Sequence, residues 1–500
     1  MSNSFNFSSF SRQSSKGILV IYMNLIFKGI KFTWFLLFLI LKDFSAVSAR
    51  IGINYMYLGL GLILLFLLVR SYLIYKNFQF KIEDEHFILK QGILKKTNTA
   101  IPFHRIQNIN FKQNIVQQII GVFEVSIETA GSSKTEIGIQ ALSFAKATAL
   151  KEIISKSSKF DTQHITDTES KPFVKIRFPE LFKVSLTENH LQNLFLFLAL
   201  VIGFFQQINQ VIDGFGEVLS LDGFIAENKN VVSGGILFVF TLLILLILIA
   251  FLSSFVRVFL VHFNLTASLK EDAFEINQGL FTKKSIVLKK QKVQNITIST
   301  NPLKRLIGIS FITFKQAVSG KLNKKKDKLI RIVGCKASQV EIIKKSLFDT
   351  TELENKEKNF SKNYYKRRIF IITLLILFIL YAIAYQIINS VIVFYSMIIV
   401  FPVVVFLILK KVKKRYYKIS DSMLLVARGL LETHLTYLEI FKVQNIKMKQ
   451  NIFQEGSDVA DLILQTASGK IKIPCICFED AIKIYNHTLY KVETSKKSWM

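Results

Sequence analysis

Residues 80–114 read FKIEDEHFILKQGILKKTNTAIPFHRIQNINFKQN, and two later stretches follow the same pattern. They are LTASLKEDAFEINQGLFTKKSIVLKKQKVQNITISTN at 265–301 and YYKISDSMLLVARGLLETHLTYLEIFKVQNIKMKQN at 416–451. In each stretch a glycine precedes a Gln-Asn pair by 15 residues, and an asparagine follows that glutamine by seven. A fixed spacing of this kind indicates an internal threefold repeat. The residues that define the repeat are Gly92, Gln107, Asn108 and Asn114; Gly279, Gln294, Asn295 and Asn301; and Gly429, Gln444, Asn445 and Asn451.

Each stretch continues into a second alternating run that ends in a glycine turn, at Gly131, Gly320 and Gly469. Alternation rich in β-branched and aromatic residues, interrupted by Gly, Asn and Lys, predicts antiparallel strands. A helical pattern then follows, beginning near Ala141, at Ser338 and near Phe478. In the second copy Ser338 and Glu341 match the S-x-x-E capping box of a helix N-terminus. Strands closed by one helix predict a small α+β domain of about 80 to 90 residues in each copy.

The chain is too apolar for an ordinary soluble protein, since 51% of its residues are hydrophobic and its mean hydropathy is +0.37. A helix needs about 20 apolar residues to cross a bilayer. Lys28 and Lys31 interrupt a further apolar run at 17–41, which is either one imperfect span or an interfacial amphipathic helix followed by a short span. Five apolar stretches qualify with few charges: 54–75, 191–211, 234–256, 369–388 and 391–410. Together with the run at 17–41 they give six spans, and consecutive spans pair into three hairpins.

The net charge of +30 is concentrated in the long segments between the hairpins, as in KKVKKRYYK at 410–418. The short connections within the hairpins hold few cations. Positive residues next to spans stay on the cytoplasmic side. We therefore expect a multi-pass protein of the cytoplasmic membrane, with both termini and all three repeats on the cytoplasmic face. The polar N-terminus has no clear cleavage site, which predicts no cleaved signal peptide.

Three short motifs recur: a G-(I/L)-(L/F) turn, an (R/K)-(I/V)-Q-N-(I/V) strand, and an E-T-A-G or T-A-S-G turn. In these motifs and in its paired apolar helices the chain resembles the bacterial pleckstrin-homology-like (bPH2) membrane proteins of the YdbT type. The resemblance covers most of the chain and implies a seven-stranded, strongly bent sheet capped by a helix in each domain. The third copy departs from the others, because Glu432 and His434 stand where the first two have Lys95-Lys96 and Lys283-Lys284. This difference argues against a shared anion site in the third copy.

The expected fold class is a helical membrane protein with α+β domains. Six transmembrane helices in three pairs alternate with three PH-like β-sandwich or barrel domains, each capped by a C-terminal helix. The expected boundaries are an N-terminus with a candidate interfacial helix at 1–31, hairpin 32–75, domain 76–160, linker 161–190, hairpin 191–256, domain 257–348, basic linker 349–368, hairpin 369–410 and domain 411–495.

No constellation of residues supports catalysis. The histidines are scattered, and the sequence contains no zinc-protease motif, nucleotide-binding loop or hydrolase elbow. Cys335, Cys475 and Cys477 are most simply explained as buried thiols in a reducing compartment. We therefore expect no enzyme, no catalytic residue, no metal and no cofactor.

Basic residues of the second copy are the candidate binding site, because several cations beside a membrane attract anionic headgroups. The candidates for anionic lipid or phosphate are Lys283, Lys284, Lys289, Lys290, Lys321, Lys324, Lys325, Lys326 and Lys328. The alternative is a solvated charged loop that only enforces topology. For the repeated Gln-Asn pairs, a structural role at a strand edge or turn is favoured over ligand binding.

Two functions follow as hypotheses. The first is a non-catalytic scaffold that binds anionic lipids, or another PH-like membrane protein, at the inner leaflet; the resemblance suggests a role in the cell envelope or in tolerance of membrane stress. The second is a transporter or export component in which the six spans surround a pathway. Nucleic acid is not expected as a partner, since Tyr364 and Tyr365 lie at a span end and fit an interfacial belt better than base stacking.

Overall fold

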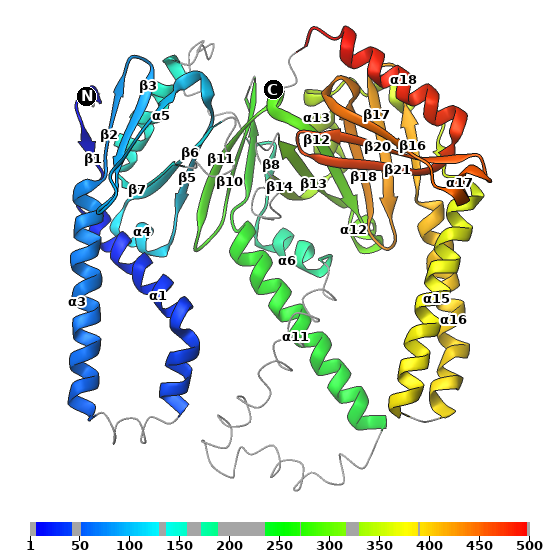
Figure 1. Ribbon diagram of the computed structural model, residues 1–500, viewed down its shortest axis with the longest axis horizontal. Coiled ribbons are helices and arrows are strands. Elements are labelled where there is room, and N and C mark those ends of the chain that lie inside the picture. The colour runs from blue at the N-terminus through cyan, green and yellow to red at the C-terminus, as the bar shows by residue number, and fades with distance from the viewer. Residues whose placement is uncertain are drawn as a thin grey trace. The chain divides into compact units, whose positions relative to one another are not determined.

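The computed structural model describes residues 7–42, 52–129, 137–157, 172–188, 236–270, 272–316, 330–388 and 391–497 (Figure 1). The chain divides into two compact units. Unit 1 comprises Met1–Lys171, Ser268–Leu288 and Ser319–Lys321, and unit 2 comprises Pro172–Ala267, Lys289–Val318 and Leu322–Met500. The boundary runs through the second repeat, so that one part of this copy belongs to each unit.

Each copy contains seven strands and a closing helix among the described residues. Copy 1 consists of β1 (Ser11–Arg12), β2 (Gln79–Glu83), β3 (His86–Gln91), β4 (Thr97–Pro102), β5 (Ile106–Gln113), β6 (Phe123–Thr129), β7 (Ile137–Leu142) and α5 (Phe144–Ser157). Copy 2 consists of β8 (Val174–Lys175), β9 (Thr266–Leu269), β10 (Ala273–Gln278), β11 (Lys283–Lys289), β12 (Val293–Thr300), β13 (Ile309–Gln316), β14 (Ile330–Lys336) and α13 (Ala337–Leu347). Copy 3 consists of β15 (Asn359–Phe360), β16 (Tyr416–Ile419), β17 (Met423–Gly429), β18 (Thr433–Glu439), β19 (Val443–Lys449), β20 (Val459–Thr466), β21 (Gly469–Cys477) and α18 (Phe478–Thr494).

The strands of a copy do not form the single bent sheet that the resemblance implied. In unit 1, copy 1 has one sheet of order β1-β2-β3-β4, and its remaining strands join a sheet in which β7-β6-β5-β11-β10 are consecutive. In unit 2 the order is β14-β13-β12-β18-β17-β16-β15, with a separate sheet β19-β20-β21. Copies 1 and 3 are therefore sandwiches that split after their fourth strand, and strands of neighbouring copies pair with each other.

Apolar residues from both sheets and the closing helix form the core of each sandwich. In copy 1, Phe80 and Phe87 stack with ring centroids 5.8 Å apart and are completely buried. Leu150 of α5 closes this core. The corresponding core of copy 3 includes Leu438, Leu462 and Ala481 of α18. Removing these side chains from water stabilises each sandwich as a separate unit of packing.

The repeated glycine has a steric cause. Gly92, Gly279 and Gly429 have φ angles of +111°, +108° and +149°. A Cβ atom on any of them would lie within about 2 Å of the backbone oxygen three residues later, at 2.0, 2.1 and 1.9 Å. Only glycine fits this turn between the third and fourth strands, which explains why the residue recurs.

The closing helices of the three copies begin close to the expected positions. The predicted capping box of Ser338 and Glu341 was wrong. β14 continues to Lys336, and α13 starts at Ala337, so that Ser338 lies inside the first turn. The backbone N–H of Lys336 donates to Gln339 Oε1 at 2.8 Å. Glu341 instead accepts from Lys344 Nζ at 2.8 Å, one turn along the helix.

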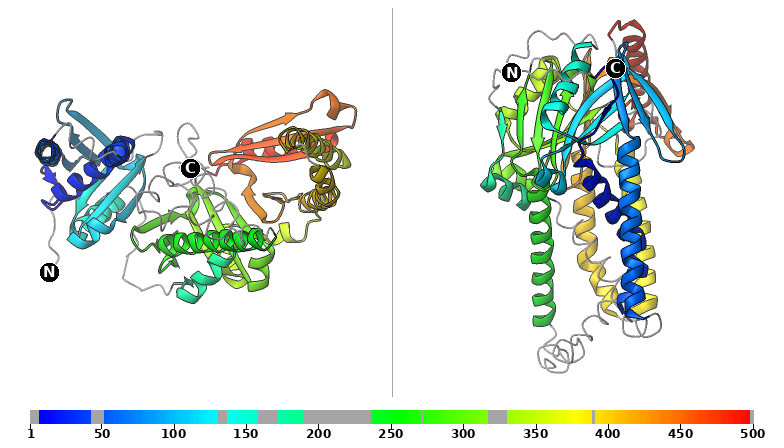
Figure 2. Two further views of the ribbon diagram at one scale, coloured as in Figure 1. Left: turned by 90° about the horizontal axis from the view of Figure 1, so that it is seen from below. Right: turned by 90° about the vertical axis from the view of Figure 1, so that its left-hand side faces the viewer.

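Five long helices coincide with expected spans: α1 (Gly17–Lys42), α3 (Ile53–Asn77), α11 (Ile236–His262), α15 (Asn363–Ile388) and α16 (Val391–Lys413). Among the described residues, α3 and the Ile244–His262 part of α11 are long and apolar enough to cross a membrane. The expected span at 191–211 lies outside the described residues. Residues 17–41 form one continuous helix. Within unit 1, α1 lies beside α3, and within unit 2, α15 lies beside α16 (Figures 1 and 2).

Two expected linkers contain ordered elements. Residues 172–188 form β8 and α6 (Phe178–Leu186), and β8 pairs with β9 through Val174 and Ala267. Helix α6 packs on α11 through aromatic rings, as Phe178 does on Phe259 with centroids 5.8 Å apart. The other linker forms α14 (Thr351–Glu354) and β15, which pairs with β16. Both linkers therefore supply a short strand to the following copy.

Candidate functional site: the junctions between copies

Two strand pairs join neighbouring copies. At junction 1, in unit 1, β5 of copy 1 pairs with β11 of copy 2, and Lys283 lies opposite Gln113. At junction 2, in unit 2, β12 of copy 2 pairs with β18 of copy 3, and Thr433 lies opposite Thr300. In both cases the residue four after the repeat glycine faces the residue six after the repeat glutamine. The two junctions therefore use the same antiparallel register.

Junction 1 places two lysines face to face. Lys284 of β11 lies directly opposite Lys112 of β5, and the exposed Lys283 is next to them. Residues directly opposite in an antiparallel pair have Cβ atoms about 5 Å apart, and like charges there destabilise the pair. Gln118 of α4 (Ile115–Ile120) crosses the junction and donates to the backbone oxygens of Leu280 and Phe281 at 3.2 and 3.0 Å. An anion between the lysines would relieve their repulsion.

Junction 2 replaces these lysines with neutral hydrogen-bonding groups. The side-chain oxygens of Thr297 and Thr436 lie 3.2 Å apart, and Ser299 Oγ lies 2.8 Å from His434 Nδ1. Asn295 of the Gln-Asn pair donates to Ser468 Oγ of copy 3 at 2.6 Å. Both Gln294 and Asn295 are buried, with exposed fractions of 0% and 1%. The Gln-Asn pair of copy 2 is thus enclosed at the boundary with copy 3.

A buried lysine strengthens junction 2. Lys304 of α12 (Pro302–Ile307) is 2% exposed, donates to Glu432 of copy 3 and lies 3.8 Å from the ring centroid of Phe311. Arg331 lies over the same ring and reaches Glu188 at 3.5 Å. Burial lowers the pKa of Lys304, and the hydrogen bond to Glu432 opposes that shift. Glu432, one of the departures of copy 3, therefore forms an ion pair between copies.

The asparagine that closes each repeat caps a short helix. Asn114, Asn301 and Asn451 accept from the backbone N–H three residues later at 2.8, 2.7 and 2.8 Å, at the N-termini of α4, α12 and α17 (Ile452–Glu455). Asn301 also donates to the backbone oxygen of Thr187 at 2.8 Å. A side chain that satisfies a free helix N–H explains the fixed spacing of this asparagine.

In copies 1 and 3 the last strand accepts a hydrogen bond from the segment that precedes the copy's first long helix, α1 or α15. Ser14 donates its N–H to Ala141 O at 2.9 Å, and Lys362 donates its N–H to Cys475 O at 2.9 Å. In copy 2 the equivalent residue is Gly334, where a Cβ would lie 3.1 Å from side-chain atoms of Ile176 and Val184. In each copy this residue lies three positions before the first residue of the closing helix. The segments that precede α1 and α15 are thus attached at the same position in copies 1 and 3, and the segment of β8 and α6 packs at the equivalent position in copy 2.

The bacterial PH domain family model matches residues 36–158, 198–350 and 369–492, which is more than half of the chain and corresponds to the three copies. The chain belongs to the bacterial PH domain family. A curated relative, the UPF0699 transmembrane protein YdbT of Bacillus subtilis (strain 168), is 24% identical over 286 residues. That alignment covers 54% of this chain, and the chain spans only 56% of the relative's length.

Exposed apolar residues gather on the capped helices of these PH copies. Ile119 of α4 is 80% exposed, Leu306 of α12 is 84% exposed, and Ile452 and Phe453 of α17 are 84% and 79% exposed. Within unit 1, Ile120 at the end of α4 packs beside Val20 of α1. Within unit 2, α17 lies at the edge of the copy 3 sheets from which α15 and α16 leave (Figure 1). Contiguous exposed apolar groups are typical of surfaces that contact lipid or protein.

The structure separates the lysines that the sequence grouped together. Lys283 and Lys284 begin β11 and lie at junction 1, whereas Lys289 ends the strand and Lys290 lies in the following turn of 3₁₀-helix, Lys290–Lys292. Lys321, Lys324, Lys325, Lys326 and Lys328 lie outside the described residues. The side chains of Gln107 and Asn108 are also outside the described part, although their backbone forms β5. Among the described lysines of this set, Lys284 lies directly opposite a further cation, Lys112, and Lys283 precedes it in the strand.

Two of the three thiols, those of Cys335 and Cys475, are buried. Burial raises the pKa of Cys335 to about 12 and that of Cys475 to about 11, so both stay protonated near neutral pH. Cys477 is half-buried. Within the part of the chain that the structure describes, no group of three or more His, Cys, Asp or Glu side chains could hold a metal ion.

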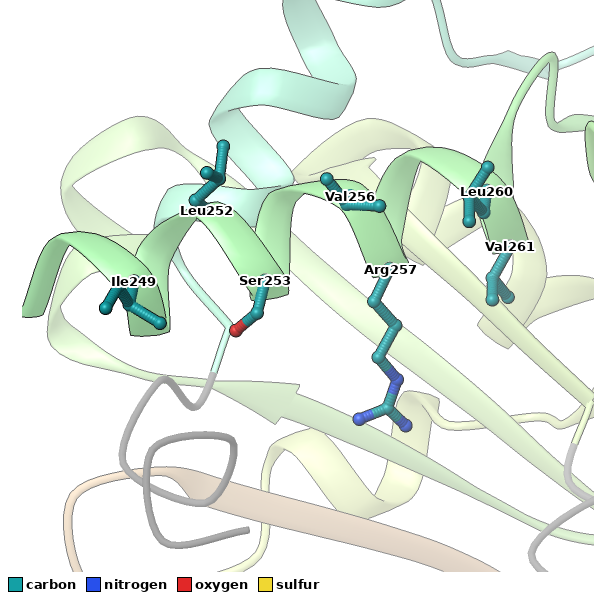
Figure 3. Close-up of a pocket in the computed structure, with 7 residues that line it drawn as sticks. All are labelled: Ile249, Leu252, Ser253, Val256, Arg257, Leu260 and Val261. Atoms are coloured by element: carbon teal, nitrogen blue, oxygen red, sulfur yellow. The ribbon is translucent and has the colours of Figure 1, made fainter. Parts of the chain in front are cut away.

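One hollow lies along α11 (Figure 3). A single helix lines it, mainly with apolar side chains such as Leu252, Val256 and Leu260. Arg257 projects from the helix on the side of Ser253, away from Leu252 (Figure 3). A surface lined by one helix does not enclose a ligand. Its apolar composition fits contact with lipid or with another helix.

Proposed function

We propose that the chain is a non-catalytic scaffold, anchored in the cytoplasmic membrane, that holds three PH domains against the inner leaflet and binds anionic lipid headgroups or another membrane protein. The observation that carries this proposal is the exposed apolar surface of α4, α12 and α17. Apolar side chains on short, polar-flanked helices insert into the boundary between headgroups and acyl chains. Lipid is therefore the surface that covers them.

The direction of the long helices supports the proposed placement of the three domains at the inner leaflet. Within unit 2, α11, α15 and α16 leave the sheets on one side (Figures 1 and 2). The last turn of α16 carries Lys410, Lys411 and Lys413, and α15 begins at the basic Tyr364–Arg368 run. Cations at these helix ends favour the cytoplasmic face. The name of the Bacillus subtilis relative, a transmembrane protein, agrees with a membrane location.

Junction 1 is the proposed contact for an anionic headgroup. Lys112, Lys283 and Lys284 come from two copies and lie on adjacent strands. Lys284 and Lys112 lie directly opposite each other and therefore on one face of the sheet, whereas Lys283 points to the other face. The repulsion between Lys284 and Lys112 falls when a phosphate lies between them, and each cation near an anionic leaflet contributes about 1 kcal/mol. Junction 2 lacks this feature, because His434 faces Ser299 at the equivalent position. The lipid site is accordingly specific to the first junction.

Membrane contact by α17 is tested with a tryptophan at Phe453. In a background where both native tryptophans, Trp34 and Trp499, are phenylalanine, Phe453→Trp is reconstituted into nanodiscs with and without brominated lipids. We expect strong quenching of its fluorescence by the brominated lipids. The control is Tyr490→Trp, at a 63% exposed position on α18, a helix on the opposite side of the copy 3 sheets from α15 and α16 (Figure 1). Equal quenching at the two positions, or none at residue 453, would refute the proposal.

Headgroup binding is tested with the double substitution Lys283→Gln and Lys284→Gln. Protein extracted from phosphatidylglycerol-containing nanodiscs is examined by native mass spectrometry for retained lipid. We expect the double variant to lose retained phosphatidylglycerol, whereas Lys470→Gln with Lys483→Gln, two exposed lysines of copy 3, keeps it. Competition by millimolar inorganic phosphate, without any preference among lipids, would instead identify a free-phosphate site.

A further inference from the structure

The chain contains the two strand types of a third junction, but one lies in the first copy and the other in the third copy. β4 of copy 1 is the counterpart of β11 and β18, and it ends the described sheet β1-β2-β3-β4. β19 of copy 3 is the counterpart of β5 and β12, and it ends the described sheet β19-β20-β21. An edge strand exposes a row of backbone donors and acceptors that another strand can pair with.

The Gln-Asn pair shows the difference between a paired and an open edge. In β12, Gln294 and Asn295 are enclosed by copy 3. In β19 the equivalent Gln444 and Asn445 are exposed. The same residues at the same repeat positions thus change from buried to exposed when the neighbouring copy is absent from the described sheet.

From these observations we propose that β19 pairs with β4 of a second copy of this chain, in the register of junctions 1 and 2. That register places Thr97 opposite Lys449, Thr99 opposite Lys447 and Ile101 opposite Asn445. The interface is head-to-tail, so the dimer keeps one open β4 edge and one open β19 edge, and the contact propagates along the membrane.

The residues at these edges are compatible with pairing. No like charges face each other in the register, whereas junction 1 forms even with Lys284 opposite Lys112. Pro102, which has no N–H, corresponds to Glu439, one residue beyond the last paired residue of junction 2, Leu438. The proline therefore limits the length of the pairing without interrupting it.

Head-to-tail pairing also keeps both chains in one bilayer. Junction 2 joins copies whose long helices α11, α15 and α16 leave on the same side of unit 2. An interface built in the same register repeats that relationship between chains. Two molecules anchored in the same membrane can therefore form it without inversion of either one.

Cysteine cross-linking tests the register directly. Thr99 and Lys447 occupy the repeat positions of Thr436 and Thr297, whose side-chain oxygens lie 3.2 Å apart at junction 2. Thr99→Cys and Lys447→Cys are placed in separate, differently tagged full-length chains, both carrying Cys477→Ser, and are co-expressed in membranes. Mild oxidation should give a disulfide-linked dimer that contains both tags, because directly opposed strand positions lie within disulfide reach.

The matched control replaces Lys447→Cys with Lys470→Cys, an exposed lysine on the other edge strand of the same sheet, β21. We expect the mixed dimer to exceed the control by about tenfold, since a random collision lacks the fixed geometry of paired strands. A single chain with Thr297→Cys and Thr436→Cys serves as the positive control at junction 2. Failure of the mixed dimer while that positive control cross-links would overturn the proposal.

Two other outcomes also refute it. A dimer formed by Lys447→Cys alone would show β19 pairing with itself. An internal disulfide in one chain carrying both Thr99→Cys and Lys447→Cys, without any mixed dimer between separate chains, would show that the array closes on itself.

Discussion

Ser299 Oγ lies 2.8 Å from His434 Nδ1 across the strand pair that joins copy 2 to copy 3. His434 takes the repeat position of Lys284, which faces Lys112 at the other junction. The register of the two junctions is the same, and their chemistry is different. One junction opposes two cations, and the other contains a titratable group in a half-buried polar cluster.

Junction 2 should weaken as the pH falls. Burial lowers the pKa of His434 below its usual value of about 6.5, with Arg428, Lys304 and Arg331 acting in the same direction and Glu432 opposing them. The folded state thus binds the proton less readily than the unfolded state. Stability is therefore retained above about pH 6.5 and declines as the pH falls from there toward the lowered pKa of the folded protein.

Hydrogen exchange at pH 7.5 and pH 5.5, corrected for intrinsic rates, measures this effect in β12 and β18. We expect faster exchange at the lower pH, and His434→Gln should remove most of the difference. The variant His487→Gln, which changes a histidine of α18, should retain it. Identical pH dependence in the wild type and His434→Gln would contradict the assignment.

The repeat glycine should be far less replaceable than other glycines with positive φ. Gly92→Ala brings a Cβ to within 2.0 Å of Lys95 O, whereas Gly121 has φ of +71° and open space around it. The strained φ angle alone costs about 1–2 kcal/mol, and the collision in Gly92→Ala adds a comparable amount or more. Thermal unfolding in detergent should show a small decrease for Gly121→Ala and a much larger one for Gly92→Ala. Equal decreases would contradict the steric argument.

The local structure of each copy could be predicted from the sequence because its causes are local. Alternation specifies strands, and the turn at Gly92, Gly279 and Gly429 tolerates only glycine. The pairing between copies could not be predicted in this way. The strands β5 and β12 can satisfy their backbone groups with any edge strand of suitable register, and a single sequence does not specify which one.

The candidate site was predicted only in part for the same reason. Lys283 and Lys289 are six residues apart on one strand, but the residue that approaches Lys284 is Lys112, which is distant in sequence. The role of Glu432 depends on Lys304, which lies 128 positions earlier in the chain. The spacing of the closing asparagines was visible in the sequence, but the short helices that they cap have only four to six residues, too few for a periodic pattern.

The asparagine caps should differ in their contributions. Asn451 caps α17, whereas Asn301 caps α12 and also donates to Thr187 O. Loss of a cap costs about 1 kcal/mol, and loss of a further hydrogen bond costs about 1 kcal/mol more. Asn301→Ala should therefore lower the thermal unfolding midpoint more than Asn451→Ala. Asn301→Asp retains the acceptor but not the donor, and an effect as large as that of Asn301→Ala would show that capping contributes nothing there.

Removing one charge of the Lys304–Glu432 ion pair at junction 2 should lower the stability of the fold far more than replacing both charged residues. Glu432→Gln leaves Lys304 buried without its counter-charge, which costs about 3–5 kcal/mol in comparable pairs. Lys304 occupies the position of Gln117 and Gln454 in the other copies, so a glutamine fits this position in the fold. Adding Lys304→Gln to Glu432→Gln should therefore recover most of the lost stability.

The comparison is an exposed ion pair of similar geometry, Lys491 with Asp421, whose nitrogen and oxygen lie 2.6 Å apart. Solvent screens exposed pairs and leaves them little net effect, so Asp421→Asn should change the thermal unfolding midpoint little. The order of stability that we expect is wild type and Asp421→Asn first, the double variant close behind, and Glu432→Gln last. If Glu432→Gln were as stable as Asp421→Asn, the enclosure of Lys304 between copies 2 and 3 would be wrong, because a charge left in that environment cannot be neutral in its effect.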